Sequence, residues 1–252
     1  MPITPLILAL APLAPFSAGA EPSTPPAALS LQDKPPMNVW TGAVNASAIF
    51  TDGNTETRSA NAAADAQYRR EHDRTTLGAF WNYQDDKSGV LQRRTGARAQ
   101  YDYFFSEKNY AFAQTSIEND KQADLARRWI LGAGAGRQFI EDAVHKVSAE
   151  LGLSWFDEHF NNSADHDFFA ARGAYKWDWV INKAWTFFHG AEIYPSVEDI
   201  EDVYAKVDTR LKVVLSEKMF AQGQWVMDWD NSPATGKESV DNRYILSVGW
   251  SF

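Results

Sequence analysis

Apolar and polar residues alternate along most of this chain, from about residue 38 to its last residue. The clearest example is VYAKVDTRLKVVL (203–215), in which the first and every second residue is apolar or Thr and the residues between are mostly charged. A period of two places these two sets on opposite faces of a β-strand. In a helix, at about 100° per residue, the charged positions would scatter and leave no apolar stripe. The segment is therefore predicted to be a strand with one apolar and one polar face.

The same pattern recurs about twelve times, in segments of roughly ten residues that are rich in Thr, Val, Tyr, Trp and Phe. The connections alternate between short ones, such as SEKN (106–109), and longer, often acidic ones, such as DEHFNNSADHD (157–167). Short turns on one side and long loops on the other are typical of an outer-membrane barrel. The predicted strands are 39–50, 59–69, 75–84, 95–105, 109–120, 128–140, 146–156, 167–180, 185–194, 203–215, 220–230 and 242–252.

The composition of the apolar faces indicates which solvent they meet. They are rich in Ala and Gly, as in SANAAADAQYR (59–69), and their aromatic residues gather near strand ends. Small residues build a poor soluble core but face lipid well, and terminal aromatics form the girdles of membrane barrels. We therefore predict an all-β fold, a transmembrane antiparallel up-and-down β-barrel of about 12 strands. The alternative is a soluble secreted β-barrel binding protein with its apolar faces turned inward.

The last strand ends on an aromatic residue with no polar tail. Its apolar face is formed by Tyr244, Leu246, Val248, Trp250 and Phe252, while Ile245 is an apolar residue on the polar face. An open sheet edge is not tolerated in lipid, so the last strand should pair with the first. We predict that these five residues form the barrel-closing C-terminal signal through which the barrel-insertion machinery recognises the chain.

Composition and the first residues set the cellular context. Residues 1–20 contain an apolar stretch and a small-x-small motif and are predicted to be a signal peptide, although no Lys or Arg precedes the apolar stretch. Residues 21–37 are predicted to be a Pro-rich disordered periplasmic lead-in, and residues 38–252 the outer-membrane barrel. The net charge of −9 argues against nucleic acid as a partner. An even strand number places both mature termini in the periplasm of a Gram-negative bacterium.

Several stretches resemble one known family. They are VWTGAVNASAIFTDGNTETRSANAAADAQYRR (39–70), the central hairpins within 101–141, FFHGAEIYPSV (187–197) and the closing LSVGWSF (246–252). Together they resemble the YdiY-like family of salt-induced outer-membrane proteins, a domain of unknown function numbered 481. The resemblance covers about residues 38–252. It implies an outer-membrane barrel with a link to salt stress, and it implies no reaction, ligand or catalytic residue.

If the apolar faces meet lipid, the polar faces line the lumen. Acidic and basic residues are nearly balanced there, so they either pair and brace the wall or line a narrow aqueous path. Lys206, Arg210 and Lys212 form a cationic ladder that suits contact with anions, unless Asp228 and Asp230 on the next strand neutralise it. The charged residues predicted to line the lumen are Asp65, Arg69, Arg98, Asp102, Glu118, Glu150, Arg172, Lys176, Asp178, Glu192, Lys206, Asp208, Arg210, Lys212, Asp228, Asp230 and Arg243.

Three local motifs suggest other chemistry only weakly. GAGAG (132–136) lies within a predicted strand with no helix after it, so small inward residues that ease barrel curvature explain it better than a dinucleotide site. The long loop with His159, Asp165 and His166 has no strong metal-ligand spacing. TDGNTE (51–56) begins like a calcium loop but lacks the later ligands, which favours a tight turn.

A small passive channel or a structural envelope component, linked to osmotic or salt stress, is the function that these patterns favour. Its expected partners are outer-membrane lipid and lipopolysaccharide, and the pattern leaves the oligomeric state open. The competing class is a barrel enzyme acting on membrane lipid, which would need a Ser beside a His. His189 is the one His within a predicted strand, and the pattern shows no Ser partner for it. We assign no catalytic residue, cofactor or metal.

Overall fold

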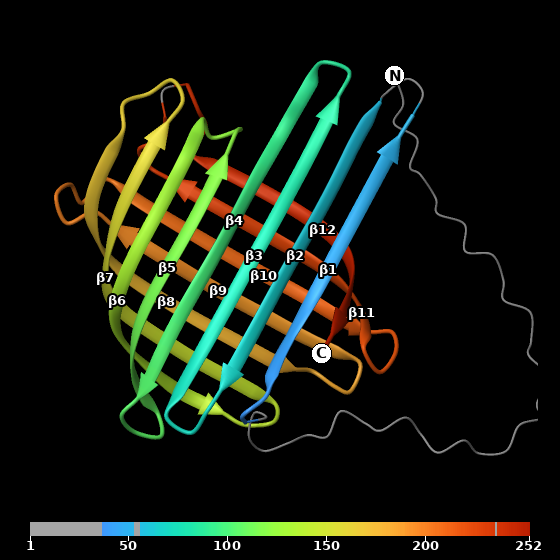
Figure 1. Ribbon diagram of the computed structural model, residues 1–252, viewed down its shortest axis with the longest axis vertical. Coiled ribbons are helices and arrows are strands. Elements are labelled where there is room, and N and C mark those ends of the chain that lie inside the picture. The colour runs from blue at the N-terminus through green and yellow to red at the C-terminus, as the bar shows by residue number, and fades with distance from the viewer. Residues whose placement is uncertain (1–36, 53–55, 235) are drawn as a thin grey trace, which may run out of the picture.

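The computed structural model describes residues 37–252 apart from 53–55 and 235. The predicted signal peptide and nearly all of the predicted lead-in lie outside this range. Twelve strands form one closed barrel, in which every strand is antiparallel to the next in sequence and the last pairs with the first (Figure 1). The strands are β1 (Trp40–Thr51), β2 (Thr57–Arg69), β3 (Asp73–Asp86), β4 (Gly89–Phe104), β5 (Asn109–Asp120), β6 (Leu125–Glu141), β7 (His145–Phe160), β8 (His166–Val180), β9 (Trp185–Pro195), β10 (Val203–Val214), β11 (Met219–Asp230) and β12 (Val240–Ser251).

The architecture confirms the predicted up-and-down barrel and its number of strands. Strands β1–β6 form the wall nearest the viewer in Figure 1, and the orange and red strands form the far wall. Apart from the four omitted internal positions, the stretch from residue 37 to 252 contains no helix long and apolar enough to cross a membrane.

Several strands are longer than predicted, and this corrects the predicted loop lengths. The predicted loop 85–93 is mostly strand, because β3 continues to Asp86 and β4 begins at Gly89. Likewise β7 extends to Phe160 and β8 begins at His166, so the long loop between them shrinks to residues 161–165. These extensions are rich in charged residues, which favoured a loop, yet two of those residues, Arg94 and Glu158, are enclosed in the lumen at 3% and 6% exposure. Among the connections at this end, 196–202 and 231–239 stay clearly longer than those at the opposite end.

The barrel has the inverse of a soluble protein's polarity. Its outer surface exposes large apolar side chains, including Tyr244 at 80%, Leu246 at 75% and Leu151 at 74%. Its interior contains fully enclosed charged residues such as Asp102 at 0% and Arg172 at 1% exposure. An apolar surface of this extent is stable against lipid but not against water. The fold therefore has the polarity of a membrane barrel.

Glycines in the GAGAG segment let bulky lumen side chains approach the wall. A Cβ on Gly136 would lie 2.3 Å from the ring of Tyr110, so any larger residue here would displace that ring. Tyr110 is 0% exposed and pairs with Gly136 across the β5–β6 ladder. The glycines of this strand segment therefore face inward as predicted, whereas Ala133 and Ala135 lie on the exposed outer face.

Closure at the chain ends uses the last residues of β12. The backbone N–H of Gly42 donates to the carbonyl of Phe252, and the N–H of Phe252 donates back to the carbonyl of Gly42, each at 3.0 Å. The residues of the predicted closing signal all lie on the outer surface, from Tyr244 to Phe252, the latter at 54% exposure. The seam itself is short, covering Ala43–Ala46 on β1 and Val248–Ser251 on β12.

Candidate functional site: the charged lumen

The largest group of lumen charges lies near the long loops and is centred on Arg94 of β4. Its guanidinium donates to Glu118 and Asp228, each at 2.7 Å, and its Nε lies 3.3 Å from Asp120. The Arg94 side chain is only 4% exposed. Asp228 also accepts from Arg243. We call this group the loop-end cluster: Arg94, Glu118, Asp120, Arg128, Glu158, Tyr204, Asp228, Asp230 and Arg243.

Arg128 of β6 organises the other half of the loop-end cluster. It donates to Glu158 on β7, lies 3.4 Å from Glu118 and 3.2 Å from Asp230, and stacks 4.4 Å from the centre of the Tyr204 ring. The Tyr204 hydroxyl in turn donates to Asp228 at 2.7 Å. Five donors in a fixed plane allow one Arg to satisfy several carboxylates at once. The cluster is therefore a continuous hydrogen-bonded network.

The loop-end cluster crosses the lumen. Arg94 on β4 and Asp228 on β11 are five strands apart one way around the barrel and seven the other. The same separation holds for Arg128 on β6 and Asp230 on β11. Ion pairs between opposite walls can exist only where the side chains fill the space between them. At this level, the lumen is thus bridged by protein.

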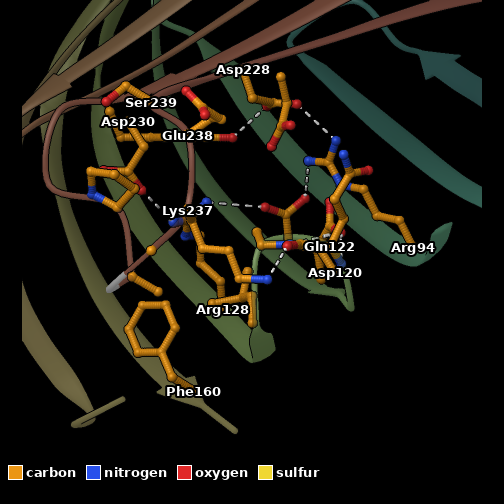
Figure 2. A pocket seen from close by; sticks show the side chains of 18 residues that line it. Arg94, Asp120, Gln122, Arg128, Phe160, Asp228, Asp230, Lys237, Glu238 and Ser239 are labelled. Carbon is orange, nitrogen blue, oxygen red and sulfur yellow. Dashed lines mark hydrogen bonds and ion pairs between the residues drawn. The ribbon is translucent and has the colours of Figure 1, made fainter. Parts of the chain in front are cut away.

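A cavity of about 190 Å³ lies beside the loop-end cluster (Figure 2). Charged side chains surround it, among them Asp230, Glu238 and Asp241. Lys237, in the loop between β11 and β12, donates from Nζ to the backbone carbonyl of Gln122 at 2.7 Å. Since Gln122 belongs to the β5–β6 turn on the opposite side of the ring, this bond reaches across the mouth of the barrel.

A second network, the turn-end cluster, lies toward the short turns and contains Arg74, Asp102, Tyr110, Glu150, Arg172, Glu192 and Tyr194. Arg172 donates to Glu150 at 2.8 Å and lies 3.6 Å from Glu192. Glu150 also accepts from Tyr110 at 2.8 Å. Both side chains of the central pair are sealed from solvent, Arg172 at 0% and Glu150 at 2% exposure. Isolated charges buried this deeply would be very costly, so pairing is essential here.

The middle cluster is smaller and more open. Asp65 on β2 accepts from Arg98 at 2.8 Å and lies 3.4 Å from Arg210 on β10. Arg210 also binds Asp208 of its own strand, at 2.5 Å. The cationic ladder is therefore interrupted at Arg210 by carboxylates other than Asp228 and Asp230. Those two acids bind arginines of the loop-end cluster instead.

The remaining residues predicted to line the lumen have weaker interactions. Arg69 stacks on Phe104, 3.6 Å from its ring centre, and Lys212 lies 5.0 Å from that of Phe220. Lys206 is in register with Asp228 on β11, and Asp178 with Lys146 on β7. Lys176 lies 4.0 Å from Glu150.

Sequence reasoning missed several residues that organise the lumen. Arg94 and Glu158 were assigned to loops, and Arg74 lay outside its predicted strand. Arg128 begins its predicted strand in phase with the lumen face, but the β-bulge between Leu125 and Arg127 breaks the alternation just before it. Predicted strands a few residues longer would include Arg74 and Arg94, because each of these residues continues the alternation of its strand. No sequence signal marked the bulge.

His159 and His189 have polar contacts of their own among the described residues. The part of the chain that the structure describes contains no group of three or more His, Asp or Glu placed to hold a metal ion. His159 contacts Asp165 at 2.7 Å and Asp157 at 3.0 Å. His189 contacts the hydroxyl of Thr209, and not that of a Ser, at 2.9 Å. His145, His159 and His166 lie in strands as well, which corrects the assignment of His189 alone.

Comparison with known proteins now adds the family. The family described as "Protein of unknown function, DUF481" matches residues 44–252. The chain belongs to this family. The "Uncharacterized protein YdiY" of Escherichia coli (strain K12) is 26% identical over 218 residues, which cover 83% of this chain and 82% of that protein. The predicted resemblance to the YdiY-like family is thereby confirmed.

Two solved structures share the fold of this DUF481 chain. The COG4313 outer membrane channel from Pseudomonas putida F1 aligns with a TM-score of 0.51 at 10% identity, over 87% of this chain and 97% of that one. The NanC porin aligns with a TM-score of 0.50 at 8% identity, over 85% of this chain and 99% of that one. At such identities the likeness concerns the fold alone. The fold is that of outer-membrane channels and porins.

Proposed function

We propose that the mature chain is a small passive channel of the outer membrane whose lumen is held closed by its own ion pairs in this conformation. The observation that carries the proposal is the position of Arg94, which binds Glu118 on the neighbouring strand and Asp228 on the opposite wall. A guanidinium bound on both sides at 2.7 Å blocks the path that a solute would take. The channel fold of the relatives described above supports the assignment to this class.

The proposed setting follows from the outer surface and the loops. An apolar belt with aromatic residues at its edges fits the outer membrane of a Gram-negative bacterium, where lipid and lipopolysaccharide would surround it. The longer connections 196–202 and 231–239 would face outward, and both ends of the mature chain would lie in the periplasm. Delivery there requires the signal peptide and recognition of the C-terminal strand by the insertion machinery. Cell fractionation of the full-length protein tests this location.

Conductance of the refolded mature protein in a planar bilayer tests the closed channel. The wild-type protein should be nearly silent. The variant Arg94→Gln/Asp228→Asn, combined with Arg172→Gln/Glu150→Gln, removes the ion pair that joins β4 to β11 and the buried ion pair between the neighbouring strands β7 and β8, and it should show steady single-channel steps. The matched control Arg98→Gln/Asp65→Asn alters the open middle cluster and should stay nearly silent. Under a salt gradient, the reversal potential then reports whether the opened lumen prefers cations or anions.

Large steady steps from the wild-type protein would refute a closed lumen. Silence of the fourfold variant, when heat-modifiable migration shows that it is folded, would instead favour a structural envelope component. The burial of Arg172 and Glu150 is the observation that favours this second candidate, because networks sealed from solvent brace a wall without guiding ions. The osmotic role implied by the family stays a prediction, tested by growth of a deletion strain at high salt.

Two further alternatives are weaker. A lipid hydrolase needs a Ser and a His in contact, and the described residues offer His189 beside Thr209 instead. Alanine at His189 should therefore leave any lipase activity unchanged. A soluble binding protein would have to keep side chains such as Leu151 and Tyr244 in water, and these are 74% and 80% exposed.

A further inference from the structure

The seam between β1 and β12 is paired along only part of its length. Four residue pairs join the two strands, from Ala43 opposite Ser251 to Ala46 opposite Val248. In contrast, β12 is paired with β11 over eleven positions, from Met219 opposite Trp250 to Trp229 opposite Val240. The seam is thus closed near the chain ends and unpaired toward the long loops.

Both strands continue beyond the paired part of the seam. Extending the observed register would place Phe50 opposite Tyr244 and Ile49 opposite Ile245, and all four residues belong to strands. Each strand stays bonded to its other neighbour over this stretch, β1 to β2 and β12 to β11.

An unpaired edge of this kind is costly in a membrane. Each backbone N–H or C=O group that faces hydrocarbon without a partner costs several kcal/mol, so barrels normally close along their whole length. In this barrel every other pair of neighbouring strands is joined over eight or more positions. The local opening is therefore a feature of the seam and not a general looseness of the wall.

The side chains beside the opening are apolar on both faces. Phe50, Tyr244 and Leu246 point outward with exposures of 75%, 80% and 75%. On the lumen face, Ile49 and Ile245 interrupt the polar alternation, and Ile49 is 58% exposed. An apolar chain passing between the strands at this level would thus meet apolar side chains on both faces.

The lumen next to the opening offers polar contacts. On the same strand, Asp241 lines the 190 Å³ cavity and Arg243 binds Asp228 at its edge. Deeper along β12, the hydroxyl of Ser247 and the amide nitrogen of Gln222 on β11 are buried without a hydrogen-bond partner among the described residues. Buried polar groups normally have partners, so these two are available to a polar ligand.

We infer that the loop-side half of the β1–β12 seam is a lateral portal for amphipathic molecules with one apolar chain. The polar head lies in the lumen cavity and the chain passes between Ile49 and Ile245 into the bilayer. The inference rests on the proposed insertion into the outer membrane and not on ion conduction.

Cysteine pairs test the opening in an otherwise cysteine-free chain. Phe50→Cys/Tyr244→Cys spans the proposed portal, and Ala46→Cys/Val248→Cys is the matched control in the paired half, on the same face and in the same register phase. A disulfide needs Cα atoms within about 7 Å, so oxidation at 50/244 should be at least about tenfold slower than at 46/248. Equal rates within one chain would overturn the portal. Links between two chains would also overturn it, because the edge would then pair with a second copy.

Fluorescence quenching tests the ligand class. A bimane label is placed by Ile245→Cys at the portal, by Leu246→Cys on the lipid face and by Gln224→Cys on the lumen face of β11, which is in register with Ile245. A lysophospholipid with a nitroxide on its chain is added to the vesicles. Quenching at 245 should approach that at 246 and exceed that at 224 severalfold. Equal protection at 245 and 224 would refute the portal, whereas absent quenching at 246 would refute membrane insertion itself.

Discussion

Replacing Arg94 by Gln is the most informative single test of the loop-end cluster. The change removes a buried charge that lies within 3.3 Å of three carboxylates, those of Glu118, Asp120 and Asp228. Glu118 and Asp228 would stay largely buried, with side chains at 12% and 11% exposure, after each loses a guanidinium partner at 2.7 Å. The folded state therefore loses pairing but keeps the cost of desolvation.

The size of this effect follows from the remaining partners. Removing one member of a buried ion pair costs about 3–5 kcal/mol in general. The loss should lie near the lower limit, because Asp228 keeps Arg243 and Tyr204 as donors and Glu118 keeps Arg128. A loss of about 3 kcal/mol lowers the folding equilibrium constant more than about a hundredfold.

Urea unfolding of the protein in lipid vesicles, followed by tryptophan fluorescence, measures this loss. The matched control is Arg98→Gln, whose side chain is 49% exposed and 2.8 Å from Asp65. Exposed pairs contribute about 0–1 kcal/mol, so this variant should stay close to wild type. If the two variants lose the same stability, the loop-end cluster is no more important than a surface ion pair, and the argument for a braced lumen fails.

Three further predictions concern packing, closure and pH. Gly136→Ala should lower the free energy of unfolding in urea by about 1–3 kcal/mol, because the new Cβ would overlap Tyr110. The control Gly223→Ala should be near neutral, because the nearest atom to its Cβ is 3.6 Å away. Equal losses would contradict the packing argument. Deleting Phe252, whose backbone closes the seam, should reduce the heat-modifiable folded form on gels, and an unchanged yield would show that closure does not need it. Backbone amides of the β6–β7 turn donate hydrogen bonds to Asp142 and lower its pKa. Ionised Asp142 therefore stabilises the folded barrel above the unfolded-state pKa of about 3.9, and this stabilisation is lost as pH falls through the folded-state pKa. Asp142→Asn should therefore lose less stability than wild type between pH 7 and pH 3. An equal loss would show that Asp142 does not contribute to the pH dependence of stability.

The alternation of side chains was sufficient to predict the barrel. Each strand carries it independently, so errors at strand ends do not accumulate into an error of architecture. In β10, for example, Lys206 to Lys212 alternate with Val207 to Leu211, and the strand lies at Val203–Val214, nearly as predicted. A bilayer that admits only apolar outer faces makes this pattern unusually reliable.

The connectivity of the lumen could not be predicted in the same way. The pattern tells which face Asp228 occupies, but the choice of Arg94 over Lys206 as its close partner depends on the barrel's cross-section and the lengths of both side chains. The bulge beside Arg128 shifts the alternation by one residue without a sequence marker such as Gly. The unpaired half of the seam also leaves no local signature, apart from Ile49 and Ile245 on polar faces.

Unequal strand lengths have a consequence for the periplasmic side of the barrel. The longest strand, β6, has 17 residues, while β9 has 11. At about 3.3 Å per residue and a tilt of about 45°, these lengths correspond to heights of roughly 40 Å and 26 Å, against an apolar belt of about 25 Å. In the register with β5, the extra residues of β6 lie beyond Arg137, toward the short turns. In the proposed orientation, the wall there extends past the apolar belt into the periplasm as ordered sheet, so a periplasmic protein arriving from that side would meet a rigid ridge.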